Sequence, residues 1–243
     1  MLSEVKNIFD ELKKNNIYHF GSYTSGSQYL YAYRLVGKYA KPGLKVLDWG
    51  TGSGHFSFFL LSQGYKVDAF TIEIECNLAD HLEKIYPGNY NLHLNQDPLA
   101  PLPFDDKTFD MVVSIGVLEH VRDTNNNEIQ SLNEIRRILK PQGIFVCYHF
   151  PNKYSWIEAL TKHINSKYNH DYKYTAQDIK EMNKKCNMKL LEHGRYGIMP
   201  RNSFRGILNN LFITTIYNSF DYLFSKLLNP FCQNYYFVSR KPD

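Results

Sequence analysis

A glycine-rich segment offers the clearest chemistry in the sequence. Residues 48–54 read Asp-Trp-Gly-Thr-Gly-Ser-Gly, at the end of a short apolar run and before a stretch expected to be helical. Glycines at alternating positions let the backbone turn tightly and let a ligand approach without a Cβ in the way. The preceding acid, Asp48, would repel a pyrophosphate and suits a ligand that carries an ammonium group. The segment therefore predicts a site for a small cationic ligand.

The spacing of these glycines argues against a dinucleotide cofactor. The dinucleotide fingerprint G-x-G-x-x-G needs its third glycine five residues after the first. Counted from Gly50 that position is His55, and counted from Gly52 it is Ser57. A nucleotide-dependent oxidoreductase is therefore disfavoured, and a turn needed only for packing is the alternative.

The elements around this segment predict an α/β fold. Apolar runs typical of strands cover 45–50, 65–72, 90–94, 109–116 and 143–150, and helix-like stretches cover 55–63, 76–86 and 127–139. Strands that alternate with helices indicate a parallel sheet covered on both faces, with right-handed crossovers. Runs at 188–197 and 232–241 add a sixth and a seventh strand. In such sheets ligands bind at the carboxyl edge, where the glycine segment would lie.

The remaining segments are expected to be mainly helical. Residues 2–13 and 27–40 have helical spacing, and 14–26 reads as a loop. Residues 155–189 also read as helical, and Thr175 to Asp178 predicts a capped helix start. We expect one domain over 1–243, made of an N-terminal helical cap (1–40), a cofactor-binding core (41–150) and an acceptor side (151–243).

An apolar ridge marks the insertion between the sixth and seventh strands. Its members recur every four residues: Leu208, Phe212, Ile216, Phe220, Phe224 and Leu228. The favoured interpretation is that the ridge packs into the core. A homodimer interface through 206–232 and an apolar channel for a lipid or quinone are alternatives. Membrane docking is disfavoured, because only five Lys or Arg lie within 196–243.

Composition limits the partners. The 243 residues are 43% hydrophobic, which predicts a folded chain. The net charge of +4 is close to neutral and does not by itself indicate binding to nucleic acid or to a membrane surface. The four cysteines, Cys76, Cys147, Cys186 and Cys232, have no metal-ligand spacing, so no metal is expected. Reduced buried thiols and a charged N-terminus without a signal-peptide pattern predict a cytoplasmic protein. No stable membrane insertion is expected.

Three segments in series resemble a known family. The string KVLDWGTGSGHFSFFL (45–60) resembles the first motif of class I S-adenosylmethionine-dependent methyltransferases. LPFDDKTFDMVVSIGVLEHV (102–121) resembles a stretch of the small-molecule branch of that superfamily. NEIRRILKPQGIFV (133–146) resembles the stretch before its fifth strand, with Gln142 in place of the usual glycine, and FPNKYSWIEAL (150–160) the loop and helix after it. The resemblance implies a Rossmann-like seven-stranded sheet with an antiparallel last strand.

The resemblance also implies a cofactor and its binding residues. The cofactor would be S-adenosylmethionine, leaving as S-adenosylhomocysteine, with Asp48 on the methionine ammonium side. Thr71 stands where the family has a ribose-binding acid, and Glu73 two residues on is the substitute. Asp97 or Gln96 would bind the adenine amine. The full predicted set is Asp48, Gly50, Thr51, Gly52, Thr71, Glu73, Gln96, Asp97, Ile115 and Gly116.

Methyl transfer from a sulfonium needs mainly alignment of donor and acceptor. An oxygen acceptor also needs a general base, for which histidine is best suited. His149 is the first candidate, with Tyr154 as a further option. His120 is a third candidate, although a purely structural role is favoured for it. On the acceptor side, His170 and Arg201 are the candidate contacts, and Arg205 would join Arg201 on a diphosphate.

The sequence thus predicts an S-adenosylmethionine-dependent methyltransferase with a small-molecule acceptor. The first choice of reaction is O-methylation of a sugar or nucleotide-sugar in surface-glycan biosynthesis. The second is methylation of a quinone-like or lipid acceptor. A non-catalytic cofactor-binding scaffold is the alternative of another class. An RNA methyltransferase is disfavoured, because no basic stripe or RNA-binding motif is present.

Overall fold

The computed structural model describes residues 2–14, 21–73, 77–97, 99–124, 126–164, 170–201 and 206–243. Seven strands form one sheet in the order β3-β2-β1-β4-β5-β7-β6. The strands are β1 (Lys45–Trp49), β2 (Lys66–Thr71), β3 (Tyr90–Leu94), β4 (Phe109–Ile115), β5 (Leu139–Pro151), β6 (Lys189–Tyr196) and β7 (Asn234–Arg240). The first five are parallel to one another, and β7 runs antiparallel to β5 and β6.

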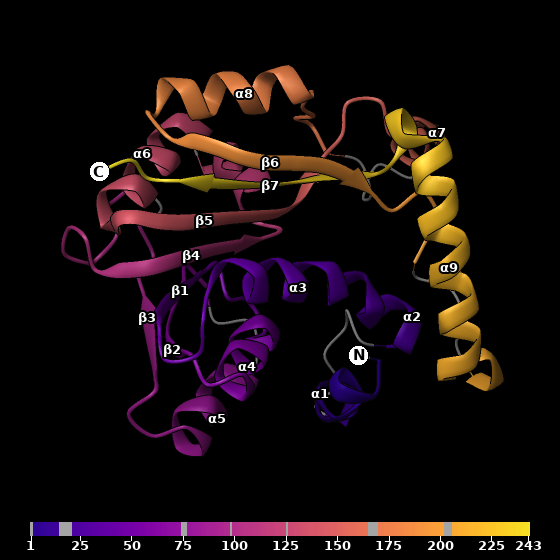
Figure 1. Ribbon diagram of the computed structural model, residues 1–243, viewed down its shortest axis with the longest axis horizontal. Coiled ribbons are helices and arrows are strands. Elements are labelled where there is room, and N and C mark those ends of the chain that lie inside the picture. The colour runs from indigo at the N-terminus through magenta and orange to yellow at the C-terminus, as the bar shows by residue number, and fades with distance from the viewer. Residues whose placement is uncertain are drawn as a thin grey trace.

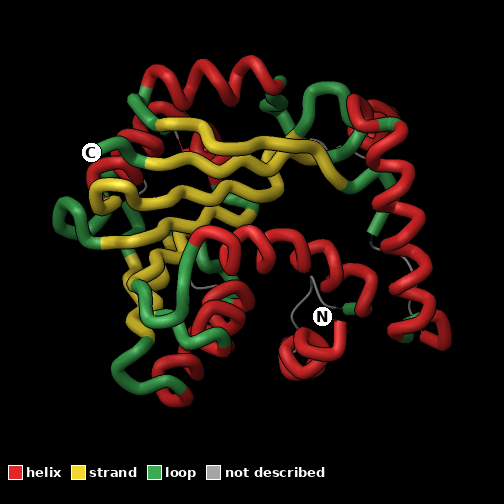
Figure 2. The backbone as a smooth tube through the Cα atoms, viewed as in Figure 1, coloured by secondary structure: helices red, strands yellow, loops and turns green. Residues whose placement is uncertain are grey.

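Helices cover both faces of the sheet (Figures 1 and 2). The α-helices are α1 (Leu2–Lys14), α2 (Tyr23–Gly26), α3 (Leu30–Tyr39), α4 (His55–Ser62), α5 (Asn77–Ile85), α6 (Glu128–Ile138), α7 (Trp156–Ile164), α8 (Ala176–Lys185) and α9 (Leu211–Leu227). Short 3-10 turns are η2 (Ser27–Tyr29), η3 (Leu118–Thr124), η5 (Gly206–Leu208) and η6 (Asn229–Phe231).

Alternating side chains build two cores. Successive residues of a strand point to opposite faces, so Val46 joins the cluster under α1, α3, α4 and α5, and Leu47 joins the cluster under α6 and α8. The predicted Rossmann-like α/β fold, with seven strands and an antiparallel last strand, is confirmed. Cys147, Cys186 and Cys232 are free and buried, as expected, and Cys76 lies outside the described residues.

Two element boundaries differ from the prediction. Helix begins at Tyr23 rather than at residue 27, because the Ser22 side chain accepts a hydrogen bond from the backbone N–H of Ser25 and caps α2. The stretch 155–189 is not continuously helical: α7 ends at Ile164, and α8 begins after Thr175. The predicted cap at Thr175 is confirmed, since its side chain and that of Asp178 form a reciprocal capping box.

The prediction that the apolar ridge packs into the core is wrong. All six ridge residues are exposed, and Phe212 is 74% exposed. The buried side of α9 instead carries Thr214, Tyr217, Asp221 and Ser225, which recur at intervals of three or four residues. A second helical stripe, made mainly of polar residues, therefore faces the protein, and this periodicity competes with that of the ridge. None of the described helices is long and apolar enough to span a membrane.

Helix α9 stands at the carboxyl edge of the sheet. Figure 1 shows it beyond the ends of β5 and β6 and beside α2. Two side chains of α9 contact the N-terminal cap: the buried Thr214, whose Oγ1 lies 3.2 Å from Thr24 Oγ1, and the half-buried Asn218, whose Oδ1 accepts a hydrogen bond from Ser27 Oγ at 3.0 Å. Segments far apart in the chain thus meet where the predicted site lies.

Candidate functional site

The glycine segment forms the turn from β1 into α4. Asp48 is buried near the end of β1, and its Oδ2 accepts a hydrogen bond of 2.7 Å from Ser57 Oγ on α4. The backbone N–H groups of Gly50 and Thr51 both donate to the Phe70 carbonyl, at 2.8 and 3.0 Å. These bonds fix the turn at the point between β1 and β4 where the strand order reverses, which is where open α/β sheets bind ligands.

Asp48 has no basic partner among the described residues. Burial raises the pKa of its carboxyl group to about 6, and hydrogen bonds from Ser57 and Thr51 oppose that rise. A buried carboxylate of this kind gains from a cationic ligand. The ammonium group of a methionine moiety has the right charge, so the donor set fits S-adenosylmethionine at this end.

The glycines of the turn have backbone conformations that other residues rarely adopt. Gly50, Gly52 and Gly54 all have positive φ, at 78°, 48° and 78°. A Cβ on Gly50 would lie 2.3 Å from Cγ2 of Val117, so this position also allows the loop after β4 to approach closely. Gly50 is therefore required by close packing as well as by the turn.

The residues predicted to bind ribose and adenine lie at the same edge. Thr71 ends β2 and is buried, and its hydroxyl donates to the backbone carbonyl of Glu73 at 2.5 Å. The Glu73 side chain is exposed. Gln96 and Asp97 follow β3 and are exposed, and Asp97 Oδ1 accepts the Leu99 N–H at 2.9 Å. Of these four, Glu73, Gln96 and Asp97 are exposed and Thr71 is buried.

Gly116, just after β4, lies next to both Glu119 and His149. It has φ of 74° and follows the half-buried Ile115. A Cβ built on Gly116 would lie 3.6 Å from Oε1 of Glu119 and 3.9 Å from Cβ of His149. The predicted sulfonium-lining residue, a buried acid and the predicted base are therefore neighbours.

His149 lies at an irregularity of β5. It has φ of 68°, a conformation uncommon for a residue with a side chain, and the pairing of β5 with β7 shifts between Tyr148 and Phe150. The Tyr196 hydroxyl accepts the His149 backbone N–H at 2.9 Å and lies 2.8 Å from its Nδ1. The register shift and this tyrosine hold His149 at the carboxyl end of β5.

One aromatic ring at this edge, that of Tyr29, was not predicted. Tyr29, buried in η2, has its ring centroid 4.6 Å from that of His55 and 5.1 Å from that of His149. It connects the N-terminal cap to the first residue of α4 and to β5. The position of Tyr29 could not be predicted from the sequence, because the N-terminal cap is rich in tyrosine and composition alone does not distinguish one Tyr from another. The buried Ser57 was likewise missed, although its hydroxyl bonds Asp48.

The other predicted contacts are dispersed. Tyr154 is exposed at the start of the acceptor side. His120 and His170 lie together, with ring centroids 5.6 Å apart. Arg201 bonds within the protein: its guanidinium donates to Asn218 at 2.9 Å, to Ser27 at 3.2 Å and to Asp221. Arg205 lies outside the described residues.

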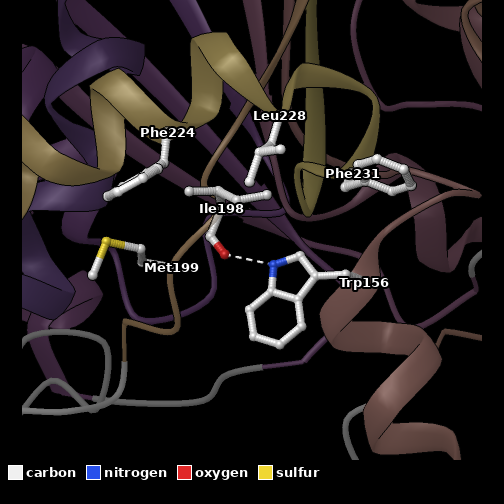
Figure 3. A pocket seen from close by; sticks show the side chains of 6 residues that line it. All are labelled: Trp156, Ile198, Met199, Phe224, Leu228 and Phe231. Carbon is white, nitrogen blue, oxygen red and sulfur yellow. Dashed lines mark hydrogen bonds between the residues drawn. The ribbon is translucent and has the colours of Figure 1, made fainter.

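An apolar pocket lies within the segment 151–243 that was predicted to form the acceptor side, here called the acceptor end. It measures about 290 Å³ and is lined by Trp156, Ile198, Met199, Phe224, Leu228 and Phe231. Figure 3 shows the Trp156 indole directed at the Ile198 carbonyl, to which its Nε1 donates at 2.7 Å. Phe224 and Leu228 belong to the exposed ridge, so the pocket continues into the apolar face of α9 and its C-terminal end.

The sheet order, the antiparallel seventh strand and the glycine turn define the class I methyltransferase fold. A crystal structure of an S-adenosylmethionine-dependent methyltransferase from Archaeoglobus fulgidus shares it, with a TM-score of 0.59 and 17% identity over 88% of this chain and 95% of that one. Residues 47–147 match the family model described as a methyltransferase domain. Residues 47–147 of this chain are therefore similar to a methyltransferase domain, and they lie in a fold shared with S-adenosylmethionine-dependent methyltransferases.

Two sequence relatives extend the comparison. An uncharacterised protein of Methanocaldococcus jannaschii is 38% identical over 103 residues, or 42% of this chain and 39% of that protein. The sterol 24-C-methyltransferase of Schizosaccharomyces pombe is 27% identical over 190 residues, or 70% of this chain and 45% of that protein. The chain thus spans less than half the length of these relatives.

Proposed function

We propose that the chain is a methyltransferase that transfers the methyl group of S-adenosylmethionine to a small-molecule acceptor. The observation that carries this proposal is the buried Asp48 carboxylate, which has no basic partner among the described residues and lies beneath a glycine turn at the switch point of the sheet. When bound, S-adenosylmethionine supplies an activated methyl group. Asp48 would bind its ammonium, and Thr71 or Glu73 its ribose. A cofactor-binding scaffold without turnover is the competing hypothesis.

For the acceptor, we infer a molecule with an apolar body. The pocket beside Trp156 has an almost wholly apolar lining, and the apolar face of α9 leads away from it. The relative from Schizosaccharomyces pombe bears the name of a sterol methyltransferase, which agrees with an apolar acceptor. The lipid or quinone-like acceptor is therefore favoured over the sugar.

O-methylation of a sugar in surface-glycan biosynthesis is the second candidate. Tyr154 and Tyr172 expose aromatic rings of the kind that stack on sugars. A nucleotide-sugar is less favoured, because the Arg201 guanidinium already donates hydrogen bonds to Asn218 and Asp221, and these donors would be needed to bind a diphosphate. In either case we place the protein in the cytoplasm, acting without nucleic acid. A homodimer through 206–232 would cover the exposed ridge.

A methyl-transfer assay tests this function. The protein would be incubated with S-adenosylmethionine labelled in its methyl group and with separate panels of quinols, sterols, fatty acids and nucleotide-sugars. We expect label in an apolar product and, in Trp156→Ala, at least a tenfold rise in the KM for that acceptor with cofactor affinity unchanged. Phe220→Ser is the control, because Phe220 lies on α9, the helix of the pocket residue Phe224, but outside the pocket lining. Label only in nucleotide-sugars would overturn the apolar acceptor, and cofactor binding without label would favour the scaffold.

A further inference from the structure

Three side chains beside the proposed cofactor site form a compact cluster. They are Glu119 and His120 of η3, and His170 in the segment that precedes α8. One carboxylate oxygen of Glu119 and one ring nitrogen from each histidine lie within 4.8 Å of one another. Fifty residues separate the two histidines, so only the fold brings them together.

Each histidine is oriented by a carboxylate. His120 Nδ1 lies 2.9 Å from Asp123 Oδ2, and His170 Nδ1 lies 2.6 Å from Glu158 Oε1. An Nδ1–H that donates to a carboxylate leaves the lone pair on Nε2. Metal-binding histidines in proteins are generally held this way, because the carboxylate fixes the tautomer and the orientation of the ring.

The third member is a buried acid with an unused oxygen. Glu119 is only 5% exposed, and its Oε2 has no hydrogen-bond partner in the part of the chain that the structure describes. An unpartnered carboxylate of this kind is costly to bury, and a bound cation would offset the cost.

We propose that Glu119, His120 and His170 bind a divalent transition-metal cation. Two imidazole nitrogens and one carboxylate oxygen match the preferences of Zn²⁺, Co²⁺ or Fe²⁺, whereas Mg²⁺ and Ca²⁺ prefer oxygen ligands. Three protein ligands leave coordination positions open, as in catalytic rather than structural sites. The expectation of no metal came from cysteine spacing, which carries no information about these residues.

The cation would lie next to the methyl-transfer position, a placement that rests on the proposed function. The Glu119 carboxylate approaches Gly116, which is predicted to line the sulfonium. An acceptor hydroxyl on an open coordination position would lose its proton more readily. The proton would pass to solvent, the oxygen lone pair would form the O–CH₃ bond, and the S–CH₃ bonding pair would remain on the sulfur. The cluster thus favours O-methylation of an acceptor hydroxyl.

Cobalt titration of the metal-stripped full chain tests the site. Co²⁺ binding would be followed by its visible ligand-field absorption and by calorimetry, with Mg²⁺ as a comparison. We expect one Co²⁺ per chain, bound far more tightly than Mg²⁺. Affinity should fall at least tenfold in His120→Ala, His170→Ala and Glu119→Gln. Glu158→Gln leaves all three ligands in place but removes the partner of His170, so affinity should fall about 10- to 100-fold.

The control is His193→Ala, because His193 lies on β6 outside the cluster. It should bind Co²⁺ like the unaltered chain, and circular dichroism would verify that each variant is folded. Failure to bind Co²⁺, or equal binding by folded His170→Ala and the unaltered chain, would overturn the metal site. Separate titration with S-adenosylmethionine distinguishes this failure from failure of the proposed function, since cofactor binding does not depend on the cation.

Discussion

The cofactor edge and the acceptor end of this molecule are built in different ways. At the cofactor edge the hydrogen bond of the buried acid is local, because Asp48 bonds Ser57, nine residues away. At the acceptor end the contacts join distant segments, as in Thr24 with Thr214 and Ser27 with Asn218. The cofactor edge is therefore encoded in short motifs, whereas the acceptor end depends on the whole fold.

Removing the Asp221 carboxylate should have the largest effect on stability. Asp221 is buried on α9, where it accepts the backbone N–H groups of Ile198 and Met199, at 2.9 and 2.8 Å, and pairs with Arg201. Asp221→Ala leaves a partly buried guanidinium unpaired, so we expect a loss of about 3–5 kcal/mol in the free energy of unfolding. Denaturant unfolding measures it, with the exposed Lys226→Ala on the same helix as control. A loss below about 1 kcal/mol would show that the distant contacts do not hold the acceptor end.

Replacing Asp48 should raise the free energy of unfolding, whereas replacing Asp221 should lower it. Its folded pKa of about 6 exceeds the unfolded value of about 3.9, so folding favours the protonated form. The unaltered chain therefore loses stability as pH rises from about 4 to about 6 and remains less stable above that range. Asp48→Asn lacks this loss. We expect it to be more stable at pH 8, by on the order of 2 kcal/mol, and nearly equal to the unaltered chain at pH 4.

Unfolding curves at several pH values would show this divergence. A variant less stable than the unaltered chain at pH 8 would mean that the Asp48 carboxylate is structural. It would then resemble Asp221, and the contrast between the two regions would disappear.

The Tyr196 hydroxyl makes a contact that joins the two regions, and removing it tests the role of that contact. It accepts the His149 backbone N–H and lies 2.8 Å from the ring nitrogen Nδ1. We expect Tyr196→Phe to cost about 1 kcal/mol and to shift the pH profile of methyl transfer if His149 is the base. Tyr31→Phe, which removes an exposed hydroxyl, is the control. An unchanged pH profile would remove His149 from the proposed chemistry.

Substitution on the apolar ridge should have the smallest effect. Phe220 is 51% exposed, so Phe220→Ser should change the free energy of unfolding by no more than about 0.5 kcal/mol. Thermal or denaturant unfolding of the dilute protein measures this. A loss of several kcal/mol would mean that the ridge is buried in solution, for example between two copies of the chain.

The sequence allowed the seven strands and the glycine turn to be predicted from local patterns, and the antiparallel last strand from the family resemblance. It did not predict the orientation of α9: Leu208 to Leu228 form a regular apolar stripe, but Thr214, Tyr217, Asp221 and Ser225 form an equally regular one on the other side. Hydrophobic periodicity detects only the first. The proximity of His120 to His170 and the place of Tyr29 were also beyond prediction, since long-range packing creates both.

The most direct test of the cofactor site is calorimetric titration with S-adenosylmethionine, S-adenosylhomocysteine and NAD. It would be made on the unaltered chain and on Asp48→Asn, which is expected to be folded and stable. We expect micromolar binding of both adenosyl ligands, none of NAD, and roughly a tenfold or greater loss of adenosyl affinity in the variant. Absence of adenosyl binding, or equal affinity in the two proteins, would contradict the assignment of Asp48 and its glycine turn to the cofactor.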